Sequence, residues 1–231
     1  MTLLGVRIDN FTFQEALNKI RDFLVDGRQH YIVTVNPDFL VRAQKDQDFK
    51  NILNLADLSL ADGIGVVYGL KLLGKKIPER VSGVDLMAEI LKPEAGFKAE
   101  IFLLGGKNGV AEKIAKLYQN IKGFTEEPET AVEMINRCQP QILFVALGSP
   151  KQEKWIAQNI ARIPSVKIAI GVGGAFNFLS GRIRRAPKFL RKIGFEWFWR
   201  AFREPWRWRT IVRSVIIFPF LILEYRLKQK E

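Results

Sequence analysis

The sequence predicts an α/β fold: a Rossmann-like, mostly parallel sheet flanked by helices, with a basic, tryptophan-rich helical appendage at its C-terminal end. Before Phe178, apolar β-branched segments alternate with amphipathic segments of about ten residues or more, which is the pattern of βαβ crossovers. Most of the apolar segments run into glycine or Asp-Gly. After about Gly194 the composition changes, because tryptophan and arginine become interleaved.

The expected strands are short, and most are apolar without interruption, as expected for strands buried on both faces. In chain order they cover residues 5–9, 31–36, 58–61, 100–106, 142–148 and 166–171. The expected helices carry apolar residues at helical spacing, and the first begins with a capping box of Thr12 and Glu15. They cover residues 12–24, 38–53, 64–73, 84–91, 110–118, 129–137 and 151–161. We expect two units, an α/β domain over residues 1–194 and the appendage over residues 195–231.

Net charge and rare residue types exclude several classes of chemistry. The 231 residues carry a net charge of +12, and residues 178–231 hold fourteen Lys or Arg against four Glu. The tail is therefore expected to meet something anionic. Cys138 is the only cysteine and His30 the only histidine, which leaves too few ligands for a His/Cys metal cluster. We interpret His30 as an ordinary residue leading into a strand, and we expect a cytosolic protein because the sequence starts without a signal-peptide pattern.

Ligands of open parallel sheets bind beyond the carboxyl ends of the strands, so the polar residues and glycines found there are candidate site residues. Glycines let backbone N–H groups approach phosphate oxygens. Glycine after a strand is also common in ordinary turns. We give phosphate binding and simple turn formation equal weight. The spacing fits neither a dinucleotide fingerprint nor a P-loop, which disfavours a nicotinamide enzyme and a P-loop kinase. The candidates are Thr34, Asn36, Asp62, Gly105, Gly106, Gln152 and Asn177.

Asp62 is the best candidate for a general base, because a carboxylate next to a flexible glycine can reach a bound hydroxyl. It could equally cap the following helix. Thr34 and Asn36 could bind a sugar or could satisfy the turn that follows them. Asp46 and Asp48 resemble the metal-binding Asp-x-Asp signature of many sugar transferases, but we expect them inside a helix, where residues two apart point about 200° apart. A solvated helix face is the better interpretation of this pair.

Taken in order, segments from nearly the whole chain resemble one family. In the N-terminal half they are residues 34–37 (TVNP), 61–65 (ADGIG), 72–75 (LLGK), 78–85 (PERVSGVD) and 103–106 (LLGG). In the C-terminal half they are residues 147–153 (LGSPKQE), 171–176 (GVGGAF), 181–187 (GRIRRAP) and 196–200 (EWFWR). The family they resemble is that of the WecB/TagA/CpsF glycosyltransferases, which contains N-acetylmannosaminyl and related transferases.

The resemblance implies an inverting transfer, without metal or cofactor, from a UDP-sugar to an undecaprenyl-diphosphate-linked acceptor in cell-wall polysaccharide or teichoic acid synthesis. Transfer of N-acetylmannosamine to N-acetylglucosamine is the first reading, with UDP-N-acetylmannosaminuronic acid and UDP-glucose as alternative donors. The matching site residues are Asp62 as the base, Thr34 and Asn36 beside it, Arg80 and Gln152 for the donor, and the appendage residues Arg200 and Arg207, which close over the pocket and hold diphosphate.

Three departures from the family pattern stand out. Residues 118–125 look too short for the further strand and loop that relatives place there, which puts the edge of the sheet in doubt. Asn177 stands where many members have Asp. Thr210 stands where a third appendage arginine is usual, although Arg209 or Arg213 could serve.

Arginine interleaved with tryptophan is also typical of nucleic-acid binding. Three features favour a membrane surface: tryptophan is enriched at bilayer interfaces, the apolar run of residues 215–223 suits an interfacial segment, and a basic residue near an anionic leaflet gains about 1 kcal/mol. That run contains Pro219 and is too short for the roughly 20 residues of a membrane-spanning helix. We therefore expect a peripheral protein on the inner face of the cell membrane with no nucleic acid as partner; a plain packed C-terminal helix is the alternative.

Two function classes besides the transferase stay open at this point: a basic nucleic-acid-binding module, and a membrane adaptor that senses a nucleotide without catalysis. Steep salt dependence of binding would identify the first. Product formed from a UDP-sugar would exclude the second. The oligomeric state is open too, and a homo-oligomer would suit the shortened core because a partner subunit would supply buried area.

Overall fold

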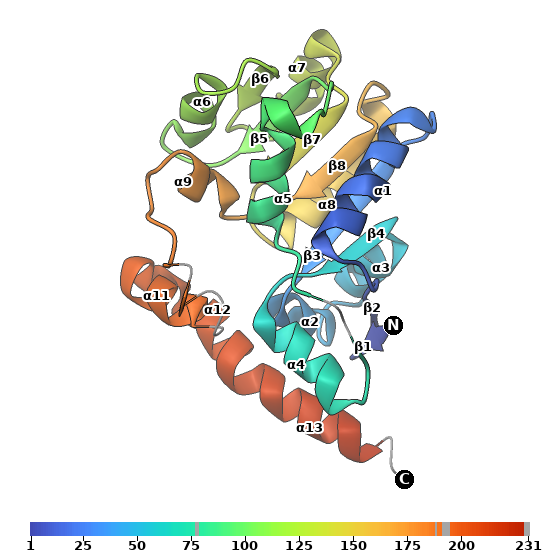
Figure 1. Cartoon of the computed structure of the whole chain (residues 1–231), viewed down its shortest axis with the longest axis vertical. Helices are drawn as coiled ribbons and strands as arrows, with labels where there is room; N and C mark the ends of the chain where they lie inside the picture. The colour runs from blue at the N-terminus through green and yellow to red at the C-terminus, as the bar shows by residue number, and fades with distance from the viewer. Residues whose placement is uncertain (77–78, 188, 191–194, 229–231) are drawn as a thin grey trace.

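A six-stranded parallel sheet forms the centre of the molecule, as the sequence predicts (Figure 1). The computed structural model describes residues 1–76, 79–187, 189–190 and 195–228. The strands are β3 (His30–Val35), β4 (Leu58–Ala61), β5 (Ile101–Gly105), β6 (Ile121–Thr125), β7 (Ile142–Ala146) and β8 (Ile168–Gly171). They stand in the order β4-β3-β8-β7-β5-β6, and every neighbouring pair is parallel. A separate antiparallel hairpin, β1 (Thr2–Leu3) and β2 (Val6–Arg7), accounts for the short strand expected near the start.

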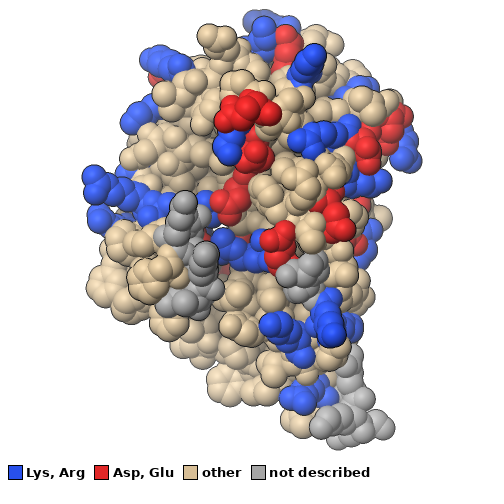
Figure 2. All heavy atoms as spheres, in the orientation of Figure 1, with Lys and Arg blue, Asp and Glu red and all other residues tan. Residues whose placement is uncertain are grey.

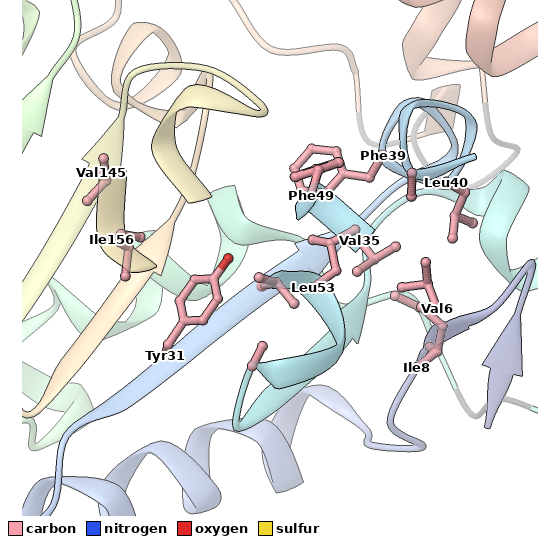
Figure 3. Close-up of a cluster of buried hydrophobic side chains, with 14 of the residues drawn as sticks. Val6, Ile8, Tyr31, Val35, Phe39, Leu40, Phe49, Leu53, Val145 and Ile156 are labelled. Atoms are coloured by element: carbon pink, nitrogen blue, oxygen red, sulfur yellow. The ribbon is translucent and has the colours of Figure 1, made fainter. Parts of the chain in front are cut away.

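Helices pack on both faces of the sheet. They are α1 (Phe13–Val25), α2 (Pro37–Ala43), α3 (Gln47–Leu55), α4 (Ile64–Leu72), α5 (Gly83–Ile90), α6 (Val110–Ala115), α7 (Ala131–Cys138), α8 (Lys151–Asn159) and α9 (Ala175–Leu179). Alternating strand residues fill two cores: Tyr31 and Val35 of β3 lie in one, and Ile32 lies in the other. Figure 3 shows the first core, where Tyr31 and Val35 lie among apolar side chains such as Leu53 and Ile156. His30 begins β3, stacks on Phe23 and pairs with Asp26, so it has the structural role expected of it.

The structure corrects the expected sheet edge and one expected helix. No strand is predicted within residues 118–125, yet β6 pairs with β5 and forms that edge. Its apolar strand pattern is weak because Gly123 stands in the middle of the strand. Glycine is needed there, since a Cβ would lie 2.7 Å from the Phe102 ring. The helix expected over residues 38–53 is divided into α2 and α3. Asp46 is the N-cap of α3, accepts a hydrogen bond from the Phe49 N–H and pairs with Lys154 at 2.7 Å, so its expected position inside a helix is wrong.

The C-terminal appendage is helical, as predicted, and packs against the α/β core. It comprises α11 (Glu196–Arg203), α12 (Trp208–Val212) and α13 (Phe218–Lys228). The end of the domain predicted over residues 1–194 falls on residues outside the described ranges, and the division itself stays a prediction. Figure 1 shows α13 alongside α4, where Phe218 and Ile222 are buried. Within the described ranges, no helix has both the length and the apolar character that crossing a membrane requires.

Phe218 holds α13 in place because α4 leaves room for its ring. A Cβ on Gly69 would lie 3.1 Å from the tip of that ring, and one on Gly65 would lie 3.7 Å from its edge. Phe218 is 3% exposed, whereas Phe220 on the same helix is 70% exposed. Truncating a buried phenylalanine removes its transfer free energy and leaves a cavity.

We therefore expect Phe218→Ala to lower the free energy of unfolding by about 3 kcal/mol, measured by urea denaturation. Phe220→Ala is the matched control and should change it by less than about 0.5 kcal/mol. Equal effects of the two substitutions would contradict the packing of Phe218 against α4.

Candidate active site

Asp62 lies directly after β4, at the rim where the carboxyl ends of the strands meet. Its backbone N–H donates to the Val35 carbonyl at 2.7 Å, which fixes the turn beside β3. The N-cap of α4 is Gly63, with φ of 110°, and α4 has no side-chain cap. The alternative that Asp62 caps this helix is therefore wrong. Its half-buried carboxylate is available for another role.

The charges around Asp62 adjust its acidity. Burial raises the pKa of Asp62 to about 6, and the nearby carboxylate of Glu196 acts in the same direction. Arg80, the Gly83 N–H and Arg200 oppose the rise by favouring the ionised form. A carboxylate with a pKa near 6 is still ionised at neutral pH, and it is a stronger proton acceptor than an ordinary Asp.

Thr34 and Asn36 follow one another around the same rim, at the end of β3. Thr34 is buried, and its hydroxyl donates to the Gly171 carbonyl at 3.4 Å. Gly83 is the first residue of α5, and a Cβ on it would lie 3.1 Å from that hydroxyl. The start of α5 therefore packs closely against β3. Asn36 is the N-cap of α2, accepting a hydrogen bond from the Phe39 N–H at 3.2 Å. The turn interpretation of Asn36 is confirmed, and sugar binding by these residues stays a prediction.

Arg80 is held by carboxylates of two elements. Its Nη1 lies 3.1 Å from Oε2 of Glu196 in α11, and its Nη2 lies 3.7 Å from Oδ2 of Asp85 in α5. Arg185, in the segment after α9, pairs with the same two carboxylates. These contacts place two arginines next to the base, at the junction of the core and the appendage.

Arg200 and Arg207 lie over the turn that follows β8. A Cβ on Gly174 would lie 2.9 Å from Nη2 of Arg200 and 3.4 Å from Nη1 of Arg207, so glycine leaves the room these side chains use. Both arginines pair with the buried carboxylate of Glu204, at 3.4 Å and 2.7 Å respectively. Their forks are therefore preorganised where they can pair bidentately with phosphate oxygens.

The two arginines expected to replace the one missing at Thr210 are engaged elsewhere. Arg213 pairs with the buried carboxylate of Asp38 in α2. Arg209 stacks over the Trp208 ring, 5.3 Å from its centroid. Neither contact includes a residue of the turn after β8.

Gln152 lies behind the turn after β8. It is 2% exposed, and its Oε1 accepts a hydrogen bond from the Gly173 N–H at 3.1 Å. Its Nε2 donates to Glu153, whose burial raises the pKa of that carboxyl to about 7. In this geometry Gln152 fixes the backbone of the turn, and a direct contact with the donor stays a prediction.

Gly105 and Gly106 are required by close packing after β5. Both have positive φ, and a Cβ on Gly105 would lie 2.9 Å from the Ala146 backbone. A Cβ on Gly106 would lie 2.6 Å from Val110. Asn177 is half-buried in α9. Phosphate or sugar contacts of these three residues stay predictions.

The site mixes charges of both signs. Arg80, Arg185, Arg200 and Arg207 alternate with Asp62, Asp85, Glu196 and Glu204. On the face of the molecule seen in Figure 2, basic and acidic side chains lie next to each other near the middle. Such a site can take up a proton and hold a diphosphate at adjacent points. Within the described ranges, no group of three or more His, Cys, Asp or Glu is arranged to hold a metal ion.

The carboxylates that organise these arginines are not among the site residues predicted from the sequence. Glu196 and Glu204 lie four residues before and four residues after Arg200. Charged residues four apart on a helix point to the same side, so this spacing could have predicted that the two glutamates lie near Arg200. Asp85 and Arg185 gave no local signal, because their pairing joins segments a hundred residues apart.

Known proteins resemble this chain over most or all of its length. The model of the glycosyl transferase WecG/TagA/CpsF family matches residues 1–231. The chain is 37% identical to an N-acetylglucosaminyldiphosphoundecaprenol N-acetyl-beta-D-mannosaminyltransferase of Bacillus subtilis, over 78% of this chain and 74% of that protein. It is 33% identical to the protein of the same name from Staphylococcus aureus strain MRSA252, over 99% of this chain and 94% of that protein. With its whole length matched, this chain belongs to the glycosyl transferase WecG/TagA/CpsF family.

Proposed function

We propose that the protein transfers N-acetylmannosamine from a UDP-sugar to N-acetylglucosamine linked to undecaprenyl diphosphate, with inversion and without a metal ion. One observation carries the proposal: a half-buried carboxylate with a raised pKa, Asp62, lies at one rim of the sheet beside Arg80 and Arg200. The names of the relatives supply the sugar and the acceptor. They favour a transferase over a nucleic-acid-binding module or an adaptor without catalysis.

The reaction needs a base on one side and fixed positive charge on the other. The acceptor hydroxyl attacks the anomeric carbon of the donor, a new C–O bond forms, and the bond to UDP breaks. Asp62 takes the hydroxyl proton, and Arg200 and Arg207 stabilise the negative charge that develops on the departing diphosphate. Arg80 lies close enough to Asp62 to favour its ionised form. A single displacement of this kind inverts the anomeric centre.

The remaining predicted residues shape the pocket around these groups. Thr34 and Asn36 line the rim next to Asp62, and Gln152 holds the turn beneath the arginines. Gly105 and Gly106 allow the backbone after β5 to lie close to the donor phosphates, and Asn177 contacts the sugar.

A donor screen tests the proposal. The enzyme is incubated with a short-chain prenyl-diphosphate-linked N-acetylglucosamine and with UDP-N-acetylmannosamine, its uronic acid or UDP-glucose, each with excess EDTA. We expect a disaccharide product from UDP-N-acetylmannosamine and unchanged turnover in EDTA. Product from one of the other two donors alone would reassign the sugar, and no product from any donor would reject the transferase.

The raised pKa of Asp62 predicts that the pH profile of kcat/KM has an acid limb, in which activity falls as the pH is lowered. Only the ionised carboxylate accepts a proton, so kcat/KM should fall as pH drops through about 6. At pH 5 we expect kcat/KM about ten-fold below its neutral plateau. Tryptophan fluorescence over the same pH range checks that the protein stays folded. Full activity at pH 5 would contradict the assignment of Asp62.

We propose that the appendage binds the inner face of the cell membrane. Large apolar side chains are exposed along its outer side, next to arginines that can meet anionic headgroups. They are Phe195, Phe198, Phe202, Trp206, Trp208, Ile216, Ile217, Phe220, Leu223 and Leu227. A homo-oligomer would cover part of this surface instead, and size-exclusion chromatography with and without detergent separates the two.

Replacing Phe202 and Trp206 together by serine should weaken binding to anionic phospholipid vesicles by about ten-fold or more, measured by co-sedimentation, because each buried aromatic contributes up to about 2 kcal/mol. Leu55→Ser, at an exposed position of α3, is the control and should bind as the unmodified protein does. Unchanged binding of the double variant would reject this surface as the contact.

A further inference from the structure

We propose that Glu196 is a positioning residue of the transfer reaction, which docks α11 onto the core and thereby holds Arg80 and Arg200 in place beside Asp62. The inference rests on the proposed function and extends it, because it assigns to the appendage a part in setting the acidity of the base.

The carboxylate of Glu196 joins three segments that are distant in the sequence. Its Oε2 lies 3.1 Å from Nη1 of Arg80, and its Oε1 lies 3.7 Å from Nε of Arg185. Arg185 in turn donates to Oδ2 of Asp85 at 2.9 Å and approaches the Ser82 hydroxyl at 3.4 Å. One side chain of α11 therefore contacts both the loop before α5 and the segment after α9.

The exposed and buried faces of α11 separate two roles. Glu196 and Arg200 are one turn apart and lie on the side that faces the core. Trp199 fixes the same side, because its Nε1 donates to the Arg184 carbonyl at 3.0 Å. Phe198 and Phe202 are exposed on the other side. The charged face of α11 thus completes the site while its aromatic face remains free for a membrane.

Loss of Glu196 would redirect Arg80. The side chain of Arg80 is only 18% exposed, and the carboxylates near it are those of Glu196, Asp85 and Asp62. With the Glu196 charge removed, Arg80 is drawn toward the remaining two, including the base itself. An arginine paired with Asp62 would occupy the carboxylate that must accept the proton.

The pKa of Asp62 depends on Glu196 and on the position of Arg80, so it reports the loss of Glu196. The charged groups that face Asp62 and Glu196 are Arg80 from the loop before α5, Arg185 from the segment after α9 and Arg200 from α11, with Asp85, Glu204 and Arg207 behind them. Glu196 raises the pKa of Asp62, whereas Arg80 and Arg200 lower it. Removing the negative charge of Glu196 therefore lowers the pKa of the base.

The test compares Glu196→Gln, Glu196→Asp and Asp62→Asn in the full chain. Glu224→Gln is the matched control, because Glu224 is exposed on α13 and pairs with Lys228, one turn further along the same helix, at 2.7 Å. For each variant, kcat/KM is measured from pH 4.5 to 8 with the short-chain acceptor, and hydrogen exchange is followed over residues 195–203. The exchange measurement reports the docking of α11 without any reference to catalysis.

For Glu196→Gln we expect an acid limb moved to lower pH, a plateau kcat/KM lower by about 10- to 100-fold and faster exchange of α11. Glu196→Asp keeps the charge on a shorter side chain and should recover part of the plateau and the position of the limb. Glu224→Gln should match the unmodified protein in all three measurements.

A Glu196→Gln enzyme with an unmoved acid limb, an unchanged plateau or unchanged exchange of α11 would overturn the inference, even if Asp62→Asn were inactive. An active Asp62→Asn enzyme would instead remove the proposed base, while faster exchange of α11 in Glu196→Gln would still support the docking role. The two failures are thus distinguishable.

Discussion

Asp62→Asn should lower kcat/KM by about 10² to 10⁴-fold, because the amide has the shape of the carboxylate but cannot accept the acceptor proton. The substitution keeps an oxygen that can receive the Gly83 N–H. The loss should appear mainly in kcat, with the KM for the UDP-sugar nearly unchanged, since the arginines that hold the diphosphate are untouched. Steady-state kinetics with varied donor at saturating acceptor measures both.

The stability of this variant provides an internal check. Because the pKa of Asp62 is higher in the folded protein than its ordinary value, the ionised form is disfavoured by folding, and that penalty is present at pH above about 6. A neutral side chain removes it, so the Tm at pH 7.5 should be unchanged or slightly higher. Asp22→Asn, at an exposed position of α1, is the control for both measurements. Normal turnover by Asp62→Asn would require another base.

Arg200→Lys and Arg207→Lys should each lower kcat/KM by about 10²-fold, since a transition-state charge that loses one preorganised donor is destabilised by about 3 kcal/mol. Lysine retains the positive charge next to the buried Glu204, so the variants should fold. It loses the planar fork that pairs with two phosphate oxygens. We therefore expect a higher KM for the donor together with a lower kcat, and weaker binding of UDP in isothermal titration calorimetry.

Arg203 supplies the matched control for these two variants. It lies on the same helix as Arg200, is exposed and stacks over Trp199, 5.4 Å from the ring centroid. Arg203→Lys should leave turnover of a short-chain acceptor unchanged in detergent, where the membrane does not contribute. If all three variants lost activity equally, the effect would lie in the net charge of the appendage and not in a diphosphate site.

Most of the fold follows from local patterns in the sequence. Continuous apolar runs such as residues 142–146 mark strands buried on both faces, because a parallel sheet covered by helices leaves no polar side. The capping box of Thr12 and Glu15 marked the start of α1, and it is present in the structure. The sequence also predicted the position of Asp62. This residue follows the carboxyl end of a strand, and ligands of parallel sheets bind at the rim formed by those ends. These features depend on residues close together in the chain.

Which charged side chains pair with one another depends on long-range packing. Arg80 pairs with Glu196, which is 116 residues away, and Arg213 pairs with Asp38, which is 175 residues away. Hydrophobic periodicity records which side of an element is buried, but it does not record what lies opposite that side. The strand β6 was missed for the same reason, because Gly123 is explained by the Phe102 ring and the Cys138 sulfur that pack against it from other elements. Local pattern thus determined where Asp62 stands, and long-range packing determined the arginines and carboxylates that set its acidity.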